Sequence, residues 1–213
     1  MSEIKEKMNV SESLQYIFFK NPVLVLGLVL GQLAAGDTTL QNGAALSVTY
    51  LLIVVPVLVF ASVIGKKLPD WLRVVSYTVL AALMLVPAYF ICGSFSATIF
   101  DSLGIYPALL AVSTVPVVFA SKIAEKQSAG EAALTGLCIG IGFAVTALIL
   151  GGAREFFGNG SLWGIKFAEA VYPAVKLPFW GFILLGFMAA GVSAASDFFR
   201  KGKEINKNEE ENQ

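Results

Sequence analysis

The sequence has no histidine, only two cysteines and few charged residues. Of its 213 residues 14% are charged and 56% are hydrophobic, and the mean hydropathy is +0.74. Without histidine, His-ligated haem, His-containing zinc sites and the usual acid–base group of neutral-pH catalysis are excluded. Cys92 and Cys138 cannot alone complete a four-thiolate metal site, and both lie in apolar blocks, as small buried hydrophobic residues do. The sequence also lacks a Walker loop, a GxSxG elbow, a CxxC pair and a dinucleotide fingerprint, so catalysis by this chain alone is not expected.

The charged residues that are present stand between long apolar blocks, which is typical of segments that cross a bilayer. We expect an all-α integral membrane protein whose six crossings fall at residues 22–35, 43–65, 72–94, 103–120, 132–152 and 179–195. Residues 1–20 predict a cytoplasmic or interfacial amphipathic segment, residues 21–197 the membrane domain, and residues 198–213 a charged, disordered cytoplasmic tail. The first twenty residues do not have the pattern of a cleavable signal peptide, so the first spans are expected to act as uncleaved insertion signals.

The first and fourth apolar blocks are short or interrupted. The first covers about 21 Å of helix, against a hydrocarbon core of about 30 Å, and ends in the small, flexible residues 31–36. Pro107 and Pro116 interrupt the fourth block. Because the order short, long, long occurs in both halves, we expect two inverted three-helix repeats with a functional site between the broken helices. The alternative is that glycine and proline fall by coincidence in ordinary spans.

The lysine and arginine residues predict the orientation of the chain. If the N-terminus is cytoplasmic, three of the fifteen, Arg154, Lys166 and Lys176, lie on the outer side. The twelve that then lie on the cytoplasmic side are Lys5, Lys7, Lys20, Lys66, Lys67, Arg73, Lys122, Lys126, Arg200, Lys201, Lys203 and Lys207. This asymmetry predicts that both termini are cytoplasmic.

Few polar side chains are placed where they would serve an ion path. The candidates at the membrane midplane or its edge are Gln32, Asp37, Thr38, Ser113 and Thr114. Asp37 and Asp101 also stand where an exposed loop would begin, so a solvated loop carboxylate is the alternative for each. The hydroxyl and amide groups have the alternative role of satisfying backbone groups of their own segments.

The most distinctive string runs from Gly151 to Gly164, in the loop expected after the fifth block. Arg154 in this string can pair with a carboxylate or cap main-chain carbonyls, and residues 158–160 have the composition of a turn. Its aromatic residues suit a membrane-interface belt or a contact with another subunit. The candidates for the subunit contact are Arg154, Glu155, Phe156 and Trp163.

Two stretches of sequence resemble a known family. Residues 21–25, which read Asn-Pro-Val-Leu-Val, and residues 154–160, which read Arg-Glu-Phe-Phe-Gly-Asn-Gly after a glycine-rich block, are similar to the membrane subunits of the Rnf and Nqr electron-transport complexes. The resemblance covers about residues 15–197 and is to the RnfE/NqrD branch. It implies a multi-pass subunit in the inner membrane of a bacterial or archaeal cell. Its complex would pass electrons from NADH or ferredoxin and couple them to Na⁺ or H⁺ movement.

The resemblance also implies a partner and a cofactor. In the family, a homologous subunit of opposite topology supplies half of an iron–sulfur cluster, held by cysteines where the broken helices of the two chains meet. The family cysteines would fall near Gly31 and Gln32 and near Ser113 and Thr114, where this chain has no cysteine. We therefore expect no family-type cluster in this chain, and flavin and iron–sulfur groups in partner subunits.

Two interpretations of function remain open from the sequence. The first is a membrane subunit of an Rnf/Nqr-like redox complex, with a structural or ion-path role because the cluster ligands are absent. The second is the substrate-binding subunit of a transporter for a small solute or vitamin, which also has about six spans. Paired broken helices fit both interpretations, and neither assigns a catalytic residue or a metal ligand to this chain.

Overall fold

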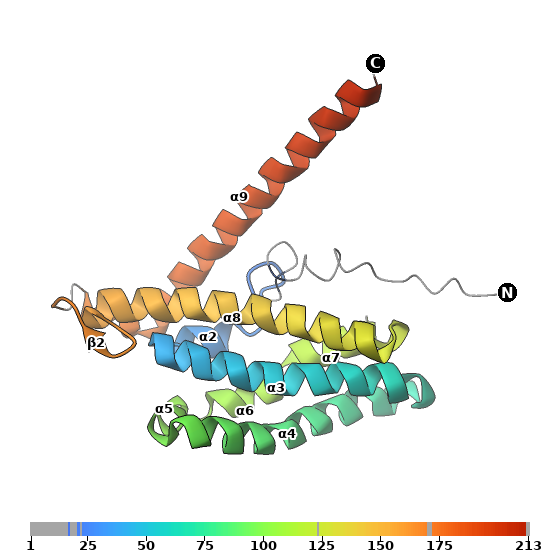
Figure 1. The fold of residues 1–213 in the computed structure, drawn as a ribbon, viewed down its shortest axis with the longest axis horizontal. Helices are drawn as coiled ribbons and strands as arrows, with labels where there is room; N and C mark the ends of the chain where they lie inside the picture. Colours follow the sequence, from blue (N-terminus) through green and yellow to red (C-terminus); the bar gives the residue numbers. More distant parts are fainter. Residues whose placement is uncertain (1–16, 18–20, 22, 123, 170–171, 212–213) are drawn as a thin grey trace.

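The computed structural model describes residues 17, 21, 23–122, 124–169 and 172–211, and these form a mainly helical protein (Figure 1). The expected interfacial segment 1–20 lies, apart from Ile17, outside the described residues. In chain order the elements are α2 Leu30–Gly36, α3 Leu40–Ile64, η1 Gly65–Lys67, α4 Asp70–Phe95, α5 Ala97–Leu103, α6 Tyr106–Ala111, α7 Thr114–Lys122, η2 Ala124–Lys126, α8 Ala129–Asn159, β1 Ser161–Leu162, β2 Ile165–Lys166, η3 Pro173–Lys176 and α9 Pro178–Glu211.

Four of the described helices are long and apolar enough to cross a bilayer. They span Leu40–Ile64, Asp70–Ser94, Ala129–Asn159 and Pro178–Phe198, and each exceeds the roughly 20 apolar residues that a hydrocarbon core requires. They match the second, third, fifth and sixth apolar blocks of the sequence. The chain is therefore a multi-pass membrane protein, while the count of six crossings and the orientation stay predictions.

Both of the blocks expected to be short or broken are interrupted in the structure. Turns replace helix before α2, where Gly27 and Val29 have backbone φ angles of 66° and 57°. The fourth block is divided into α6 and α7, which are separated at Val112 and Ser113. The two interrupted segments touch, because a Cβ built on Gly36 of α2 would lie 2.7 Å from Cγ of Tyr106 in α6.

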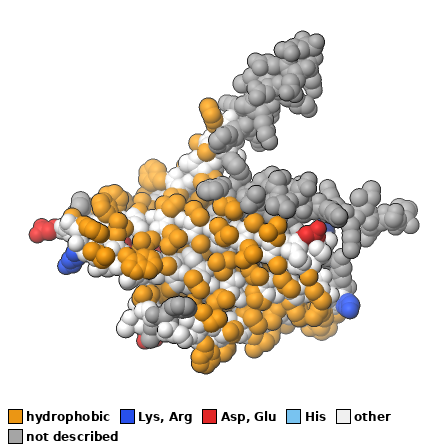
Figure 2. Space-filling view, viewed as in Figure 1, with side chains coloured by type: hydrophobic (Ala, Val, Ile, Leu, Met, Phe, Trp, Pro, Cys, Tyr) orange, Lys and Arg blue, Asp and Glu red, His pale blue; other side chains and the backbone are white. Residues whose placement is uncertain are grey.

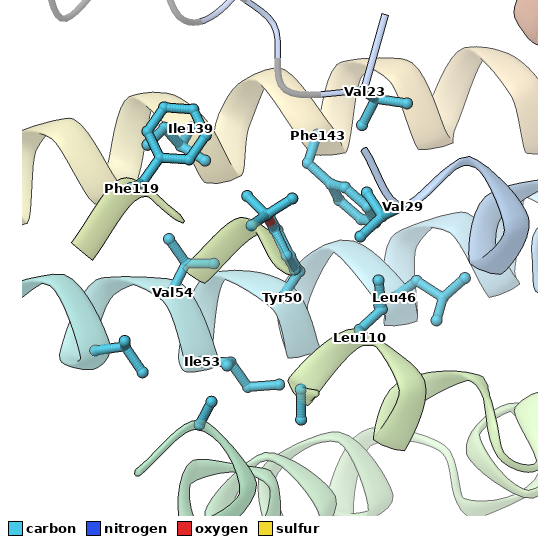
Figure 3. Close-up of a cluster of buried hydrophobic side chains, with 14 of the residues drawn as sticks. Val23, Val29, Leu46, Tyr50, Ile53, Val54, Leu110, Phe119, Ile139 and Phe143 are labelled. Atoms are coloured by element: carbon cyan, nitrogen blue, oxygen red, sulfur yellow. The ribbon is translucent and has the colours of Figure 1, made fainter. Parts of the chain in front are cut away.

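The core is a bundle in which α3 lies between α8 and α4 (Figure 1). Tyr50 of α3 stacks on Phe143 of α8 with ring centroids 4.2 Å apart, and both side chains are fully buried (Figure 3). Glycine lets the two helices approach closely, because a Cβ on Gly136 of α8 would lie 3.1 Å from Cα of Val55. Such small residues bring helices together in a membrane, where apolar packing alone favours no partner over lipid.

Helix ends follow recognisable capping chemistry. The Thr39 side chain accepts a hydrogen bond from the Asn42 amide at the start of α3. Ser128 and Glu131 form a capping box at the start of α8, which ends at Gly160 with a φ of 64°. The sequence placed the end of the fifth block near residue 152, and that boundary is wrong. Residues 154 and 155 belong to the last turns of α8. The helix can include these two charged residues because their side chains form hydrogen bonds with neighbouring segments of the chain.

The last helix, α9, begins beside the β-hairpin and then leaves the bundle (Figure 1). Its first turns pack on α2, where a Cβ on Gly181 would lie 2.6 Å from the Ala34 carbonyl oxygen, and Leu185 is buried. Most of its apolar length has no packing partner within the described chain. The helix continues to Glu211, whereas the sequence predicted a disordered tail from residue 198.

The surface of the bundle is apolar along its length. Figure 2 shows hydrophobic side chains over the visible face, with the charged side chains near its two ends. Trp71, Val79, Leu83 and Phe90 of α4, for example, all point outward and are exposed. An apolar belt between two charged ends is the surface that a bilayer requires.

Candidate functional site

A buried ionic cluster lies at the end of the bundle where α3 and α9 begin and α8 ends (Figure 1). We call it the junction and define it by Asp37, Gly43, Gly151, Arg154 and Glu155. Its three ionisable side chains are at most 1% exposed. Because buried charge is costly unless it is paired or hydrogen-bonded, the partners of each group decide what the junction does.

Arg154 uses all five of its N–H groups on main-chain carbonyls. At the end of α2, Nη1 donates to the carbonyls of Ala34 at 2.8 Å and Asp37 at 2.7 Å. Its Nε donates to Val175 at 3.1 Å, and Nη2 donates to Lys176 and Leu177, all at the end of η3. These carbonyls lie at the ends of short helices, so the guanidinium acts as a shared C-terminal cap; the Leu177 carbonyl accepts a second bond from the Trp180 amide. Of the two roles predicted for this arginine, the structure shows carbonyl capping.

Glu155 fastens a second set of segments to α8. Its Oε2 accepts a 2.9 Å hydrogen bond from the Leu40 amide, in the first turn of α3. Its Oε1 accepts from the Ser161 hydroxyl at 3.0 Å and the Gly164 amide at 2.7 Å, in the hairpin. A carboxylate is favoured at a helix N-terminus, so Glu155 stabilises α3 as well as the hairpin. Trp163 and Gly164 both have positive φ, as a two-residue hairpin turn of this kind requires.

The carboxylate of Asp37 is the group whose chemistry is left open. Asp37 lies between α2 and α3, its side chain is 0% exposed, and neither carboxylate oxygen has a hydrogen-bond partner among the described residues. Burial raises the pKa of Asp37 well above the usual aspartate range, and the Arg154 charge and the nearby Gly151 amide lower it by smaller amounts. The alternative of a solvated loop carboxylate is wrong for Asp37, because α3 and α8 enclose its side chain. Asp101, in α5, is exposed as that alternative predicted.

Two glycines make the space that Asp37 occupies. A Cβ on Gly151 would collide with Asp37 Oδ1 and would lie 2.6 Å from the carbonyl oxygen of Thr39. A Cβ on Gly43 would lie 2.9 Å from both Asp37 Oδ1 and the carbonyl oxygen of Ala147. The aspartate is therefore wedged between α3 and α8, where the two helices lack side chains. Sequence reasoning did not single out this glycine pair, although Gly151 opens the distinctive string.

The other ion-path candidates divide between buried and exposed positions. Ser113, in the break between α6 and α7, is buried and its hydroxyl has no partner among the described residues. Thr38 accepts a hydrogen bond from Asn42, which also donates to the Gly36 carbonyl. Gln32 is half-buried in α2, and Thr114 is exposed at the start of α7. The structure brings Asp37 and Thr38 to the junction, whereas Ser113 and Thr114 stay with the other interrupted segment.

The four candidates for a subunit contact also divide. Arg154 and Glu155 are buried and bind other segments of the same chain. Their side chains therefore have an internal structural role and are not exposed for a contact with another subunit. Phe156 is 44% exposed and Trp163 is 53% exposed, so these two remain available on the surface. Asn21, which the sequence marks only as the start of a motif, is buried and donates to the Gly142 carbonyl of α8.

The residues present do not fit the iron–sulfur cluster that the resemblance implied. The expected ligand positions hold Gly31, which has no side chain, Ser113, whose hydroxyl is buried, and Thr114, which is exposed. An iron–sulfur cluster is held by thiolates. Cys92 and Cys138 are buried in α4 and α8 and are free thiols, away from those positions. Within the described part of the chain, no three His, Cys, Asp or Glu side chains converge.

A separate hollow of about 290 Å³ lies between α3, the end of α4 and α5, with Trp163 of the hairpin at its edge. Its walls include Ala44, Val48, Cys92 and Phe100, and almost all of its lining is apolar. Binding sites for small solutes combine such walls with a few placed polar groups that orient the ligand. The hollow therefore gives little support to a vitamin-binding role.

Long apolar helices closed at one end by a buried ionic junction define a multi-pass membrane protein with two interrupted helical segments. A family model described as Rnf-Nqr subunit, membrane protein, matches residues 9–192. The chain belongs to this family, and it is a membrane subunit of the Rnf/Nqr type. The resemblance drawn from residues 21–25 and 154–160 is thereby confirmed.

Named relatives place the chain within this family. It is 30% identical over 187 residues to the E subunit of the proton-translocating ferredoxin:NAD(+) oxidoreductase complex of Clostridium ljungdahlii, covering 86% of this chain and 88% of that protein. It is 29% identical over 150 residues to the E subunit of the ion-translocating oxidoreductase complex of Shewanella frigidimarina, covering 70% of this chain and 65% of the relative. The match to the corresponding protein of Pseudoalteromonas atlantica has the same identity and coverage. The alignments thus span just under two thirds of the latter two proteins.

Proposed function

We propose that this chain is the E-type membrane subunit of a redox-driven, ion-translocating oxidoreductase complex. The observation that carries the proposal is the 30% identity across 86% of the chain to a subunit of such a complex. The family match over residues 9–192 supports it independently. The chain contributes no catalytic residue of its own, and electron transfer takes place in the assembled complex.

The membrane plan of the proposal has six crossings with both termini on the cytoplasmic side of a bacterial or archaeal inner membrane. Four long apolar helices and two interrupted segments support this plan. This orientation places twelve of the fifteen lysine and arginine residues on the cytoplasmic side, which supports it. The contact between Gly36 and Tyr106 supports an inverted repeat whose broken helices face each other.

The partner in the proposal is a homologous six-span membrane subunit, together with other subunits of the complex that carry flavin and iron–sulfur groups. Helix α9 supports a contact of this kind, because most of its apolar surface is unpacked after its first turns. Phe156 and Trp163 extend the exposed apolar surface at the same end of the bundle. The chain itself acts as a scaffold and as one wall of the ion path, to which Gln32, Asp37, Thr38, Ser113 and Thr114 contribute.

The proposal is tested by isolating the tagged chain from its native membranes in mild detergent. We expect a homologous membrane chain to co-purify, together with subunits whose absorption and EPR spectra show flavin and iron–sulfur groups. Isolation of a stable, cofactor-free monomer would contradict the proposal. Tight binding of a vitamin or other small solute by that monomer would instead support the transporter alternative.

The scaffold role has a separate test in the same complex. Gly31→Cys together with Thr114→Cys restores thiols near the positions that the resemblance assigns to cluster ligands. Apart from the backbone of its own helix, no heavy atom of the described residues lies within 4 Å of a Cβ built on Gly31, so the position has room for a side chain. We expect the double variant to gain a new iron–sulfur EPR signal if the family geometry persists. An assembled complex with no new signal would show that the chain has lost that geometry.

A further inference from the structure

We propose that Asp37 binds the transported monovalent cation, either a proton or Na⁺, in the gap between Gly43 of α3 and Gly151 of α8. This inference rests on the proposed function and deepens it, because it assigns one residue and one ligand class to the ion path. No redox step is involved. The carboxylate takes up one H⁺ or one Na⁺ from one side of its gap and releases the same ion.

The first reason is that Asp37 is a buried carboxylate without a partner. Its side chain is 0% exposed and neither oxygen accepts a hydrogen bond from the described residues. A buried acidic group in this condition is stable only when a proton or another cation neutralises it. Buried polar groups of folded proteins almost always have partners, so an orphaned carboxylate indicates a ligand.

The second reason is that the nearest cationic side chain cannot serve as that partner. All five N–H groups of Arg154 are donated to main-chain carbonyls. One of these carbonyls belongs to Asp37 itself, so the arginine holds the residue in place without bonding its carboxylate. The Arg154 charge nevertheless favours the ionised form of Asp37. Burial favours the carboxyl group with a bound cation, whereas the Arg154 charge favours the carboxylate without one. A site that exchanges its ion needs both states to be accessible.

The third reason is the set of oxygens around the gap. Asp37 Oδ1 and the Thr39 carbonyl oxygen both crowd the position of a Cβ on Gly151. The Ala147 carbonyl oxygen and Asp37 Oδ1 lie equally close to the position of a Cβ on Gly43, at 2.9 Å. Carboxylate and carbonyl oxygens are the ligands that hard cations prefer. If the cation is H⁺, the carboxylate alone takes it up.

The remaining charged group of the junction is already committed. Glu155, next to Arg154 on α8, accepts bonds from Leu40, Ser161 and Gly164. The other segments around Asp37 are α2 and the start of α3. The residues there, Thr39, Asn42 and Gly43, are uncharged. The positive end of the α3 dipole faces this region and stabilises the empty carboxylate during exchange. Of the two acidic residues in the junction, Asp37 is therefore the one whose carboxylate can bind and release a cation.

The test uses the assembled complex in native membranes and the apolar reagent dicyclohexylcarbodiimide, which modifies protonated carboxyl groups in apolar surroundings. Mass spectrometry of the chain reports modification at Asp37 over a pH series, in NaCl or in KCl of equal ionic strength. We expect Asp37 to be modified. Protection by NaCl but not by KCl identifies Na⁺, and loss of modification with rising pH that is the same in both salts identifies H⁺. An Asp37 that stays unmodified under every condition overturns the proposal.

A pair of variants supplies the functional readout. In Asp37→Asn we expect ion uptake per electron transferred to fall by about tenfold or more, because the amide can neither take up a proton nor balance the charge of Na⁺. The exposed Asp101→Asn is the matched control and should keep the wild-type ratio. An unchanged ratio in Asp37→Asn overturns the site but leaves the proposed function standing. Absence of redox-driven uptake in the wild-type complex would instead overturn the proposed function, and if Asp37→Asn does not assemble, the carbodiimide series on the wild type decides.

Discussion

Arg154 donates a 2.7 Å hydrogen bond to the main-chain carbonyl of Asp37, while the Asp37 carboxylate accepts no bond from it. The two residues are therefore neighbours without a direct salt bridge. The arginine serves the fold, because it caps α2 and η3 together and so fixes the start of α9. The aspartate is left for another role, and the two functions of the junction can be separated by mutation.

Arg154→Ala should destabilise the chain strongly. It leaves four carbonyls at the ends of α2 and η3 without a donor, because of the five acceptors the Leu177 carbonyl keeps the Trp180 amide. Each unsatisfied buried acceptor costs about 1–3 kcal/mol, so the expected loss in free energy of unfolding is about 3–5 kcal/mol after partial relaxation. Arg154→Lys keeps the charge but has only three donors in a different geometry, so it should lie between the wild type and alanine. Thermal unfolding of the purified protein in detergent measures both. An alanine variant as stable as the wild type would show that the capping network is unimportant.

Gly151→Ala and Gly152→Ala form a matched pair of neighbouring glycines in α8. A methyl group at 151 meets the Thr39 carbonyl and Asp37, neither of which can withdraw, and should cost about 1–3 kcal/mol. A methyl group at 152 meets Leu40 Cδ1 at 3.5 Å, an ordinary contact, and should be neutral or stabilising by up to about 1 kcal/mol. The same unfolding measurement compares them. Equal effects of the two changes would contradict the tight packing at Gly151.

The pH dependence of stability should reveal the buried state of Asp37. Its folded pKa is raised above its unfolded value, so its stabilising contribution is complete below the unfolded pKa and is lost as pH rises through the folded one. Asp37→Asn removes this titration. The variant should therefore gain stability relative to the wild type as pH rises from acid towards the folded pKa, by up to about 1.4 kcal/mol per pH unit. A difference that is constant with pH, measured by thermal melts across a pH series, would contradict a neutral buried carboxyl.

The orientation of the chain can be read from two engineered cysteines. Lys67→Cys and Lys166→Cys lie in exposed positions at the two ends of the bundle, in a background where Cys92 and Cys138 are replaced by alanine. The distribution of lysine and arginine predicts that position 166 faces outward and position 67 the cytoplasm. A membrane-impermeant maleimide should label position 166 in cells whose inner membrane is intact and position 67 only in inverted vesicles. The reverse pattern would contradict cytoplasmic termini.

The long helices and the interrupted segments could be predicted from the sequence because both depend on local composition. Apolar runs mark α3, α4, α8 and α9, and glycine and proline mark the breaks before α2 and between α6 and α7. Carbonyl capping was one of the two roles predicted for Arg154, because an arginine near the end of a helix can donate to unpaired main-chain carbonyls. The local rules also placed the end of α8 too early, because they read its glycines and charges as a loop.

The burial of Asp37 could not be predicted from its own surroundings in the sequence. Polar and small residues on both sides of it are typical of a loop. It is enclosed only because α8, far away in sequence, packs on α3 through Gly43 and Gly151. Tertiary contacts of this kind follow from helix packing, which neither hydropathy nor motif spacing encodes. The glycines were the one available signal, and it becomes readable only when the two helices are seen together.

Redox-driven ion uptake in inverted membrane vesicles tests the proposed function most directly. Vesicles from the native host, from a strain lacking this chain, and from that strain complemented with the wild-type chain are supplied with reduced ferredoxin or NADH as electron donor. We predict uptake of H⁺ or Na⁺ in the native and complemented vesicles and none above background in the deletion. Equal uptake in the presence and absence of the chain would contradict its role in an ion-translocating redox complex.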